Sequence, residues 1–240
     1  MRIIPVMDVK GGMVVHAKAG DRERYQPIKS VLTPSTNPVE VANAFKKLGA
    51  RELYIADLDA IEKRGSNLKS VLEIKKLGFD ILLDSGISTA RDVKDLADVG
   101  SIVVGTETLQ SLDELEKMTE TCEIVLSLDF KGGELLTRIK ELKNLDAEDL
   151  IKIILSYDHD IKRWIYLDLK RVGTSCGMRE DRIKKMVKSI PMPLLVGGGI
   201  NSISDIRRMQ TIGVSGVLVA TAIHNGRITK EDICGSRYQS

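Results

Sequence analysis

Short apolar runs recur along the chain and are separated by polar and amphipathic stretches. Each run is continuous rather than alternating, which is typical of strands buried on both faces of a parallel sheet. Helix-start signals lie between them, at Asn37-Pro38 before 39–48, Ser88-Thr89 before 90–96 and Ser202 before 203–209. The predicted strands are 3–7, 53–56, 81–83, 102–104, 124–128, 164–167, 194–196 and 217–219.

Eight strands that alternate with helices in 240 residues predict an α/β fold, a closed (β/α)8 TIM barrel formed by one domain, residues 1–240. The connections after Asp8 and Asp129 are the longest. Each begins with Gly-Gly and a β-prone run, at 13–16 and 134–137, so each is expected to carry a small hairpin.

An internal repeat divides the chain into half-barrels of about 1–120 and 121–240. The segment 8–12 (Asp-Val-Lys-Gly-Gly) returns at 129–133 as Asp-Phe-Lys-Gly-Gly. Three further pairs follow in the same order, 53–58 with 164–169, 84–88 with 197–201, and 103–106 with 218–221. Four matches in one order indicate that the second half is a diverged copy of the first.

The repeat nominates two catalytic carboxylates. Asp8 and Asp129 both stand just past an apolar strand, and a pseudo-twofold axis would place them across the barrel mouth, where active sites of such barrels lie. Two carboxylates in different surroundings can have different pKa values and serve as base and acid. The alternative is that each aspartate with its Gly-Gly merely makes a tight turn after a strand.

Glycine segments after the third and seventh strands predict two phosphate-binding cups, because backbone N–H groups at a strand-to-helix turn can hold a phosphate. The second-half cup is the better candidate, since Asp84 and Ser85 replace two glycines of the first cup and a carboxylate repels phosphate. Plain strand-to-helix turns are the alternative. The predicted cup residues are Gly86, Gly105 and Thr106 in the first half, and Gly198, Gly199, Ala220 and Thr221 in the second.

Asp57 and Asp168 also end strands, and together with Arg22 they are possible substrate contacts. For the segment from Asp57 to Asp59, pairing with lysines at the barrel rim is the alternative. Cys176 lies in a glycine-rich loop with no local base and is expected to be an ordinary loop residue. No metal ligand set or cofactor motif stands out, so we expect neither a metal nor a cofactor.

The composition of the chain limits the classes of molecule that it is expected to bind. Formal net charge is only +2, from 36 basic and 34 acidic residues, with no basic stripe of the kind that binds nucleic acid. The longest apolar runs, about six residues, are too short for a membrane span. The cysteines Cys122, Cys176 and Cys234 are expected to be free thiols in a reducing compartment. These features predict a cytoplasmic protein that binds neither nucleic acid nor a membrane. The glycine cups predict a small phosphorylated metabolite as its ligand, and any protein partner stays open.

The chain resembles the histidine-biosynthesis barrel family, which comprises ProFAR isomerase and the cyclase subunit of imidazole glycerol phosphate synthase. The resemblance runs from about residue 3 to 226 and is carried by segments 4–8, 20–21, 38–42, 54–60, 127–129, 173–174 and 197–200. It implies the half-barrel duplication, and it implies that Asp8 is a general base and Asp129 its partner carboxylate. The isomerase of that family converts an aminoaldose phosphate into an aminoketose by an Amadori rearrangement.

Several family positions differ in this chain. The first-half glycine triplet is Asp84-Ser85-Gly86, the threonine that ends strand six is Leu167, and the aspartate of the Asp-Gly-Thr loop is Val172. The Gly-Trp that follows strand five is absent. The longer first loop carries its own cluster, Arg22, Arg24, Tyr25 and Lys29. These departures indicate a divergent member, similar to family relatives that accompany one-carbon pterin cofactor pathways.

Three functions therefore stay open. The first is an isomerase acting on a phosphorylated sugar or aminosugar by acid–base chemistry with Asp8 and Asp129. The second is a lyase or synthase of a cofactor pathway on the same scaffold, which Leu167 and Val172 favour. The third is a non-catalytic protein that binds a phosphometabolite, against which the retained aspartate pair argues.

Overall fold

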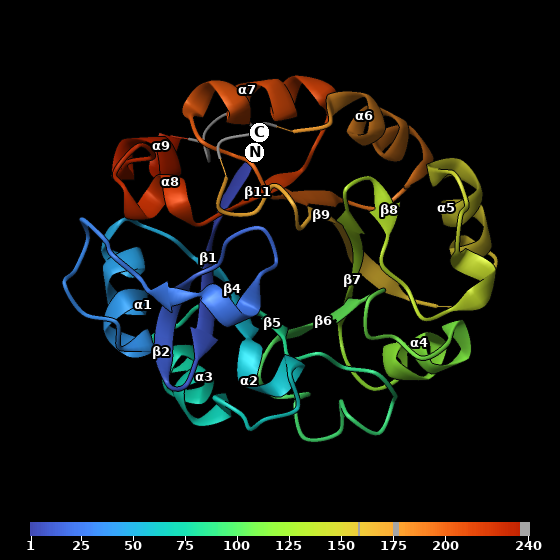
Figure 1. The fold of residues 1–240 in the computed structure, drawn as a ribbon, viewed down its shortest axis with the longest axis horizontal. Helices are drawn as coiled ribbons and strands as arrows, with labels where there is room; N and C mark the ends of the chain where they lie inside the picture. The colour runs from blue at the N-terminus through green and yellow to red at the C-terminus, as the bar shows by residue number, and fades with distance from the viewer. Residues whose placement is uncertain (158, 175–177, 236–240) are drawn as a thin grey trace.

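The structure, a computed structural model, describes residues 1–157, 159–174 and 178–235. Eight parallel strands of this part of the chain close into a barrel, because the last strand pairs with the first. Figure 1 shows the ring of helices around it. The predicted TIM barrel is confirmed, and each predicted apolar run lies in one barrel strand. These strands are β1 (Arg2–Lys10), β4 (Glu52–Asp57), β5 (Asp80–Asp84), β6 (Ser101–Gly105), β7 (Ile124–Lys131), β9 (Ile161–Asp168), β10 (Leu194–Gly197) and β11 (Gly216–Val219).

Two hairpins extend the barrel at its mouth. β1 pairs antiparallel with β2 (Met13–His16), which pairs in turn with β3 (Gln26–Pro27). β7 pairs antiparallel with β8 (Glu134–Leu135). Because these pairings prolong β1 and β7, Asp8 and Asp129 lie inside their strands rather than just past them. The carboxylates are therefore held by regular sheet, not by a turn.

Strand register creates two equivalent rows of residues at the barrel mouth. Asp8 pairs with Ala56, and Ala56 pairs with Asp84. In the second half, Asp129 pairs with Leu167, and Leu167 pairs with Gly197. The rows match the sequence repeat position by position, and they differ most where Asp84 of one half stands opposite Gly197 of the other.

Helices between the strands bury their apolar sides on the outside of the barrel. Two predicted helix starts are confirmed. The Asn37 side chain accepts hydrogen bonds from Val39 N and Glu40 N, and Ser202 forms a capping box with Asp205. The helices are α1 (Pro38–Lys47), α2 (Leu58–Ile61), α3 (Leu68–Lys75), α4 (Leu112–Thr119), α5 (Ala147–Leu155), α6 (Glu180–Ser189), α7 (Ile203–Ile212), α8 (Thr221–His224) and α9 (Lys230–Gly235), with 3-10 turns at Arg22–Arg24 and Lys140–Leu142.

The helix predicted over 90–96 is wrong, because the segment forms successive turns instead. Its backbone bonds span three residues, from Asp92 N to Thr89 O and from Leu96 N to Val93 O. Aspartates at 92, 95 and 98 have poor helix propensity, since their side chains compete for backbone groups. The Asp92 carboxylate does so here, accepting from the N–H groups of Ser88 and Thr89.

The barrel interior and the end opposite the mouth are closed. Side chains from alternate strand positions fill the interior, among them Ile4, Leu82 and Ile165. Beneath them, Arg163 bonds Glu52 Oε1 at 2.7 Å and Ser101 Oγ at 2.9 Å, joining three strands. In the described part of the chain, the cavity that reaches the barrel opens at the mouth. Within the described part of the chain, no helix has the length and apolar character needed to cross a membrane.

Candidate active site

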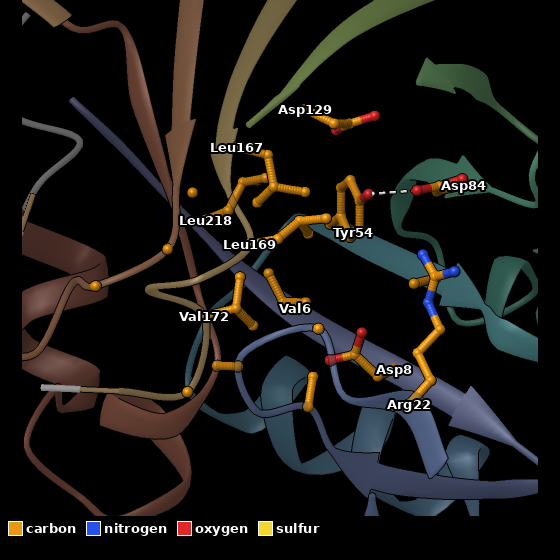
Figure 2. A pocket seen from close by; sticks show the side chains of 18 of the residues that line it. Val6, Asp8, Arg22, Tyr54, Asp84, Asp129, Leu167, Leu169, Val172 and Leu218 are labelled. Atoms are coloured by element: carbon orange, nitrogen blue, oxygen red, sulfur yellow. Dashed lines mark hydrogen bonds between the residues drawn. The ribbon is translucent and has the colours of Figure 1, made fainter. Parts of the chain in front are cut away.

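One cavity opens at the barrel mouth, at the carboxyl ends of the strands. Its lining falls into three groups, and Figure 2 labels residues of the acidic side and of the apolar floor. An acidic side holds Asp8, Asp84, Glu107 and Asp129 with Arg22; a glycine side holds Gly197, Gly198, Gly199, Ala220 and Thr221; and an apolar floor between them holds Val6, Leu167, Leu169, Val172 and Leu218.

Asp8 and Asp129 face this cavity from opposite halves, as the sequence predicted. Asp129 is 6% exposed, and its Oδ1 accepts a 2.7 Å hydrogen bond from Ser127 Oγ, two residues earlier on the same face of β7. Gly105 is needed beside it, because a Cβ there would lie 2.5 Å from Asp129 Oδ2. No described residue donates a hydrogen bond to the Asp8 side chain, whose carboxylate points into the cavity (Figure 2).

The surroundings raise the pKa of both carboxyls to about 7. Burial is the main cause in each case. The charge of Asp84 adds to both shifts, whereas Arg22 lowers the pKa of Asp8 and the Ser127 hydroxyl lowers that of Asp129. Near neutral pH each carboxyl can therefore hold or release a proton, which is the property that acid–base catalysis requires.

The raised pKa values predict a stability cost. Because the folded protein holds the Asp129 proton more tightly than the unfolded chain does, the free energy of unfolding falls as pH rises from about 4 to about 7. Asp129→Asn removes this cost and keeps an acceptor for Ser127. We expect it to stabilise the protein at pH 8 by up to about 4 kcal/mol, at about 1.4 kcal/mol per pKa unit, and to have little effect at pH 4.

Urea unfolding at the two pH values measures the effect. Asp80→Asn is the matched control, because Asp80 is exposed at the far end of β5. Equal stability of wild type and Asp129→Asn at pH 8 would contradict the raised pKa.

The second-half cup has free backbone donors. Among the described residues, no group accepts from the N–H of Gly199, Thr221 or Ala222. Gly198 and Gly199 line the cavity and adopt positive φ angles of 90° and 89°, a conformation that favours glycine. Gly197 leaves no room for a side chain, since its Cβ would meet Leu167 Cδ1 at 2.8 Å. The cup is thus small, open and rich in donors.

The residues of the predicted first-half cup lie outside the cavity lining. Gly86, Gly105 and Thr106 do not line the cavity, and Thr106 is completely buried. Their place at the cavity wall is taken by Asp84 and Glu107. The sequence ranked the two cups in this order, but it did not reveal that the first is withdrawn from the cavity.

Asp57 and Asp168 do not line the cavity either. Both side chains point to the helix side of the barrel, where they are 2% exposed. Asp57 accepts from Asn67 N at 2.6 Å and from Asn67 Nδ2 at 2.7 Å. Asp168 pairs with Arg171 at 3.2 Å. Both carboxylates are therefore held by other side chains outside the cavity, and the partner of Asp57 is Asn67 rather than the rim lysine given as its alternative.

Of the cations of the first loop, only Arg22 lines the cavity. Lys10 Nζ donates to Arg22 O at 3.0 Å, and the Arg22 guanidinium pairs with Glu107 at 3.4 Å. Arg24 instead pairs with Asp21 in solvent. The predicted cluster thus contributes one cation to the site, together with Tyr25, whose pKa is raised to about 12, mainly by burial.

The structure adds site residues that sequence reasoning did not nominate, namely Tyr54, Glu107 and Ser127. The Tyr54 hydroxyl donates to Asp84 Oδ2 at 2.9 Å. Strand periodicity offered a signal for Ser127 and Tyr54, which share a barrel face with Asp129 and Ala56 respectively. Cys176 lies outside the described residues. Of the described cysteines, Cys122 and Cys234 are free thiols. Among the described residues, no group of three or more metal-ligating side chains is placed to hold a metal ion.

Comparison with known proteins identifies the family of this chain. The family model described as histidine biosynthesis protein matches residues 2–229. The chain belongs to the histidine biosynthesis protein family. An uncharacterized protein of Methanocaldococcus jannaschii is 38% identical over 237 residues, which are 97% of each chain. A ProFAR isomerase of Thermus thermophilus is 31% identical over 235 residues, 95% of this chain and 96% of the relative.

Methanocaldococcus jannaschii also has a relative named as ProFAR isomerase, which is 30% identical over 234 residues, 95% of each chain. One organism thus holds two proteins that are similar to this chain. The chain is more similar to the uncharacterized one than to the named isomerase.

Proposed function

We propose that this protein is an acid–base isomerase of a phosphorylated sugar or aminosugar. The observation that carries the proposal is the placement of Asp8 and Asp129 in one cavity, each with a pKa of about 7, opposite a cup of free N–H groups. The cup would hold the substrate phosphate, since unpaired backbone N–H groups bind anions. The name of the relatives, ProFAR isomerase, supports the same reaction type.

In this mechanism one carboxylate removes a proton from the carbon beside the carbonyl or imine, and the other carboxyl, protonated, donates to the neighbouring oxygen or nitrogen. The first carboxyl then returns its proton to the carbon that carried the carbonyl or imine. The second, now ionised, takes the hydroxyl proton of the carbon that becomes the ketone, which completes the aldose-to-ketose shift and restores both groups. By family resemblance Asp8 is the base and Asp129 the acid. In this proposal the apolar floor keeps water away from the reacting carbons, which strengthens the electrostatic interactions between both carboxylates and the substrate.

A lyase or synthase on the same scaffold is the second candidate. The observation that favours it is the apolar floor itself, because Leu167 and Val172 offer no hydrogen bond to a sugar hydroxyl. Such an enzyme would use the same carboxylates and cup to make or break a carbon–carbon bond.

The test is a screen of phosphorylated aldoses and aminoaldoses in D2O, followed by proton NMR. An isomerase exchanges the proton beside the carbonyl for deuterium and forms the ketose. We expect at least one compound to react, and its unphosphorylated form to react at least tenfold more slowly because the cup is then empty. Carbon–carbon cleavage products would favour the lyase, and equal rates with and without phosphate would contradict the role of the cup.

A further inference from the structure

Matching backbone N–H groups in the two halves differ in whether they have a hydrogen-bond acceptor. In the second half the N–H groups of Gly199, Thr221 and Ala222 find no acceptor among the described residues. Their repeat counterparts in the first half are Gly86, Thr106 and Glu107, which are all occupied. Both sets of N–H donors are thus present, and the first-half set is hydrogen-bonded to acceptors of the protein itself.

Acceptors of the protein itself, two carboxylates and one backbone carbonyl, fill the first-half set. Gly86 N donates to Asp84 Oδ1 at 3.2 Å, and Glu107 N makes a long 3.5 Å contact with Asp129 Oδ2. Thr106 N donates to Ser127 O at 2.9 Å. Asp84 is the divergent member, since its register counterpart Gly197 has no side chain. Its carboxylate takes the donor that an anionic ligand would need.

Asp84 is held in this position. Its second oxygen, Oδ2, accepts from the hydroxyl of Tyr54, which is 4% exposed, and Figure 2 shows the pair at the cavity wall. A mobile carboxylate could swing away when a second phosphate arrives, whereas one bonded at both oxygens keeps its charge in place. Glu107 and Asp129 add negative charge nearby. An anion at this end would therefore meet like charges and no free N–H group of the first-half set. Arg22, the cation on this side, is already paired with Glu107 at 3.4 Å.

We propose that Asp84 is a built-in anion that replaces a substrate phosphate, so that the substrate is a phosphomonoester rather than a bisphosphate. The far end of this substrate, opposite its phosphate, is then a hydrogen-bond donor, a hydroxyl or an amino group facing the acidic side of the cavity. The inference rests on the proposed function, because it assumes that the second-half cup holds the single phosphate.

Inorganic phosphate is the probe, and equilibrium dialysis at saturating phosphate counts the sites. We expect one equivalent bound to wild type and two to Asp84→Gly, which removes the charge, frees Gly86 N and restores a glycine at this position. Asp84→Ala frees the same donor and serves if the glycine variant is unstable. Asp80→Asn, at the exposed other end of β5, removes an equal charge and should still bind one equivalent.

The outcomes separate the two claims. No phosphate on wild type overturns the proposed function and this inference with it. Two equivalents on wild type, or one on both Asp84 variants, overturn this inference and leave the proposed function standing. A second readout is competition by fructose 6-phosphate and fructose 1,6-bisphosphate. Wild type should bind the bisphosphate no more tightly than the monophosphate, and Asp84→Gly at least tenfold more tightly.

Discussion

Asp8→Asn should lower kcat on the phosphosugar found in the D2O screen by a factor of about 10² to 10⁴, the usual contribution of a general acid or base. Asparagine has nearly the shape of aspartate but cannot take up a proton. Because the Asp8 side chain has no hydrogen-bond donor among the described residues, the exchange should leave the fold intact. Asp129→Asn should cause a loss of similar size. We expect the double variant to be little worse than either single variant, since the two groups act as a unit.

The pH profile tests the same assignment. With both pKa values at about 7, one carboxyl must be ionised and the other protonated, so kcat/KM should pass through a maximum near pH 7 and fall on either side. Each asparagine variant should lose one limb of this curve. Rates and profiles of both variants that match those of Asp80→Asn would contradict catalysis by this pair.

Much of the fold was predictable because the barrel strands are buried on both faces. Continuous apolar runs mark such strands, and the repeat fixed their grouping into halves. The segment 90–98 was not predictable in the same way, since its aspartates bind backbone N–H groups locally and replace helix by turns. Local competition of this kind leaves the apolar pattern unchanged, so the pattern could not reveal it.

The site was predictable where equivalent positions repeat, as for Asp8 and Asp129. Asp57 and Asp168 failed as substrate contacts because they lie one residue beyond Ala56 and Leu167, which face the barrel interior, and a strand turns successive side chains to opposite faces. Glu107 could not be foreseen, because its role depends on the contact with Arg22, 85 residues away in the chain. Contacts between distant loops carry no periodic signal.

The second large effect is expected with ProFAR, whose full name contains two phosphoribosyl groups. This chain has one open cup, and Leu167 and Val172 leave part of the sugar without hydrogen-bond partners. Each lost bond is worth about 0.5–1.5 kcal/mol, and more where a buried partner is left unpaired. The two lost partners cost about 1–3 kcal/mol, and the missing hydrogen bonds to a second phosphate, each worth about 1.5–3 kcal/mol, add to this. At about 1.4 kcal/mol per tenfold, the total is about a thousandfold or more in transition-state binding. ProFAR should therefore be a poor substrate.

The kinetic constant kcat/KM for ProFAR, measured for purified wild type beside Asp8→Asn, tests the central claim that this histidine-biosynthesis barrel keeps the acid–base pair and serves a different substrate. We expect wild type to fall at least about a thousandfold below the ordinary range for enzymes, which begins near 10⁴ M⁻¹s⁻¹. A wild-type value of about 10⁴ M⁻¹s⁻¹ or above, lost in Asp8→Asn, would show that ProFAR is the substrate and would contradict the account.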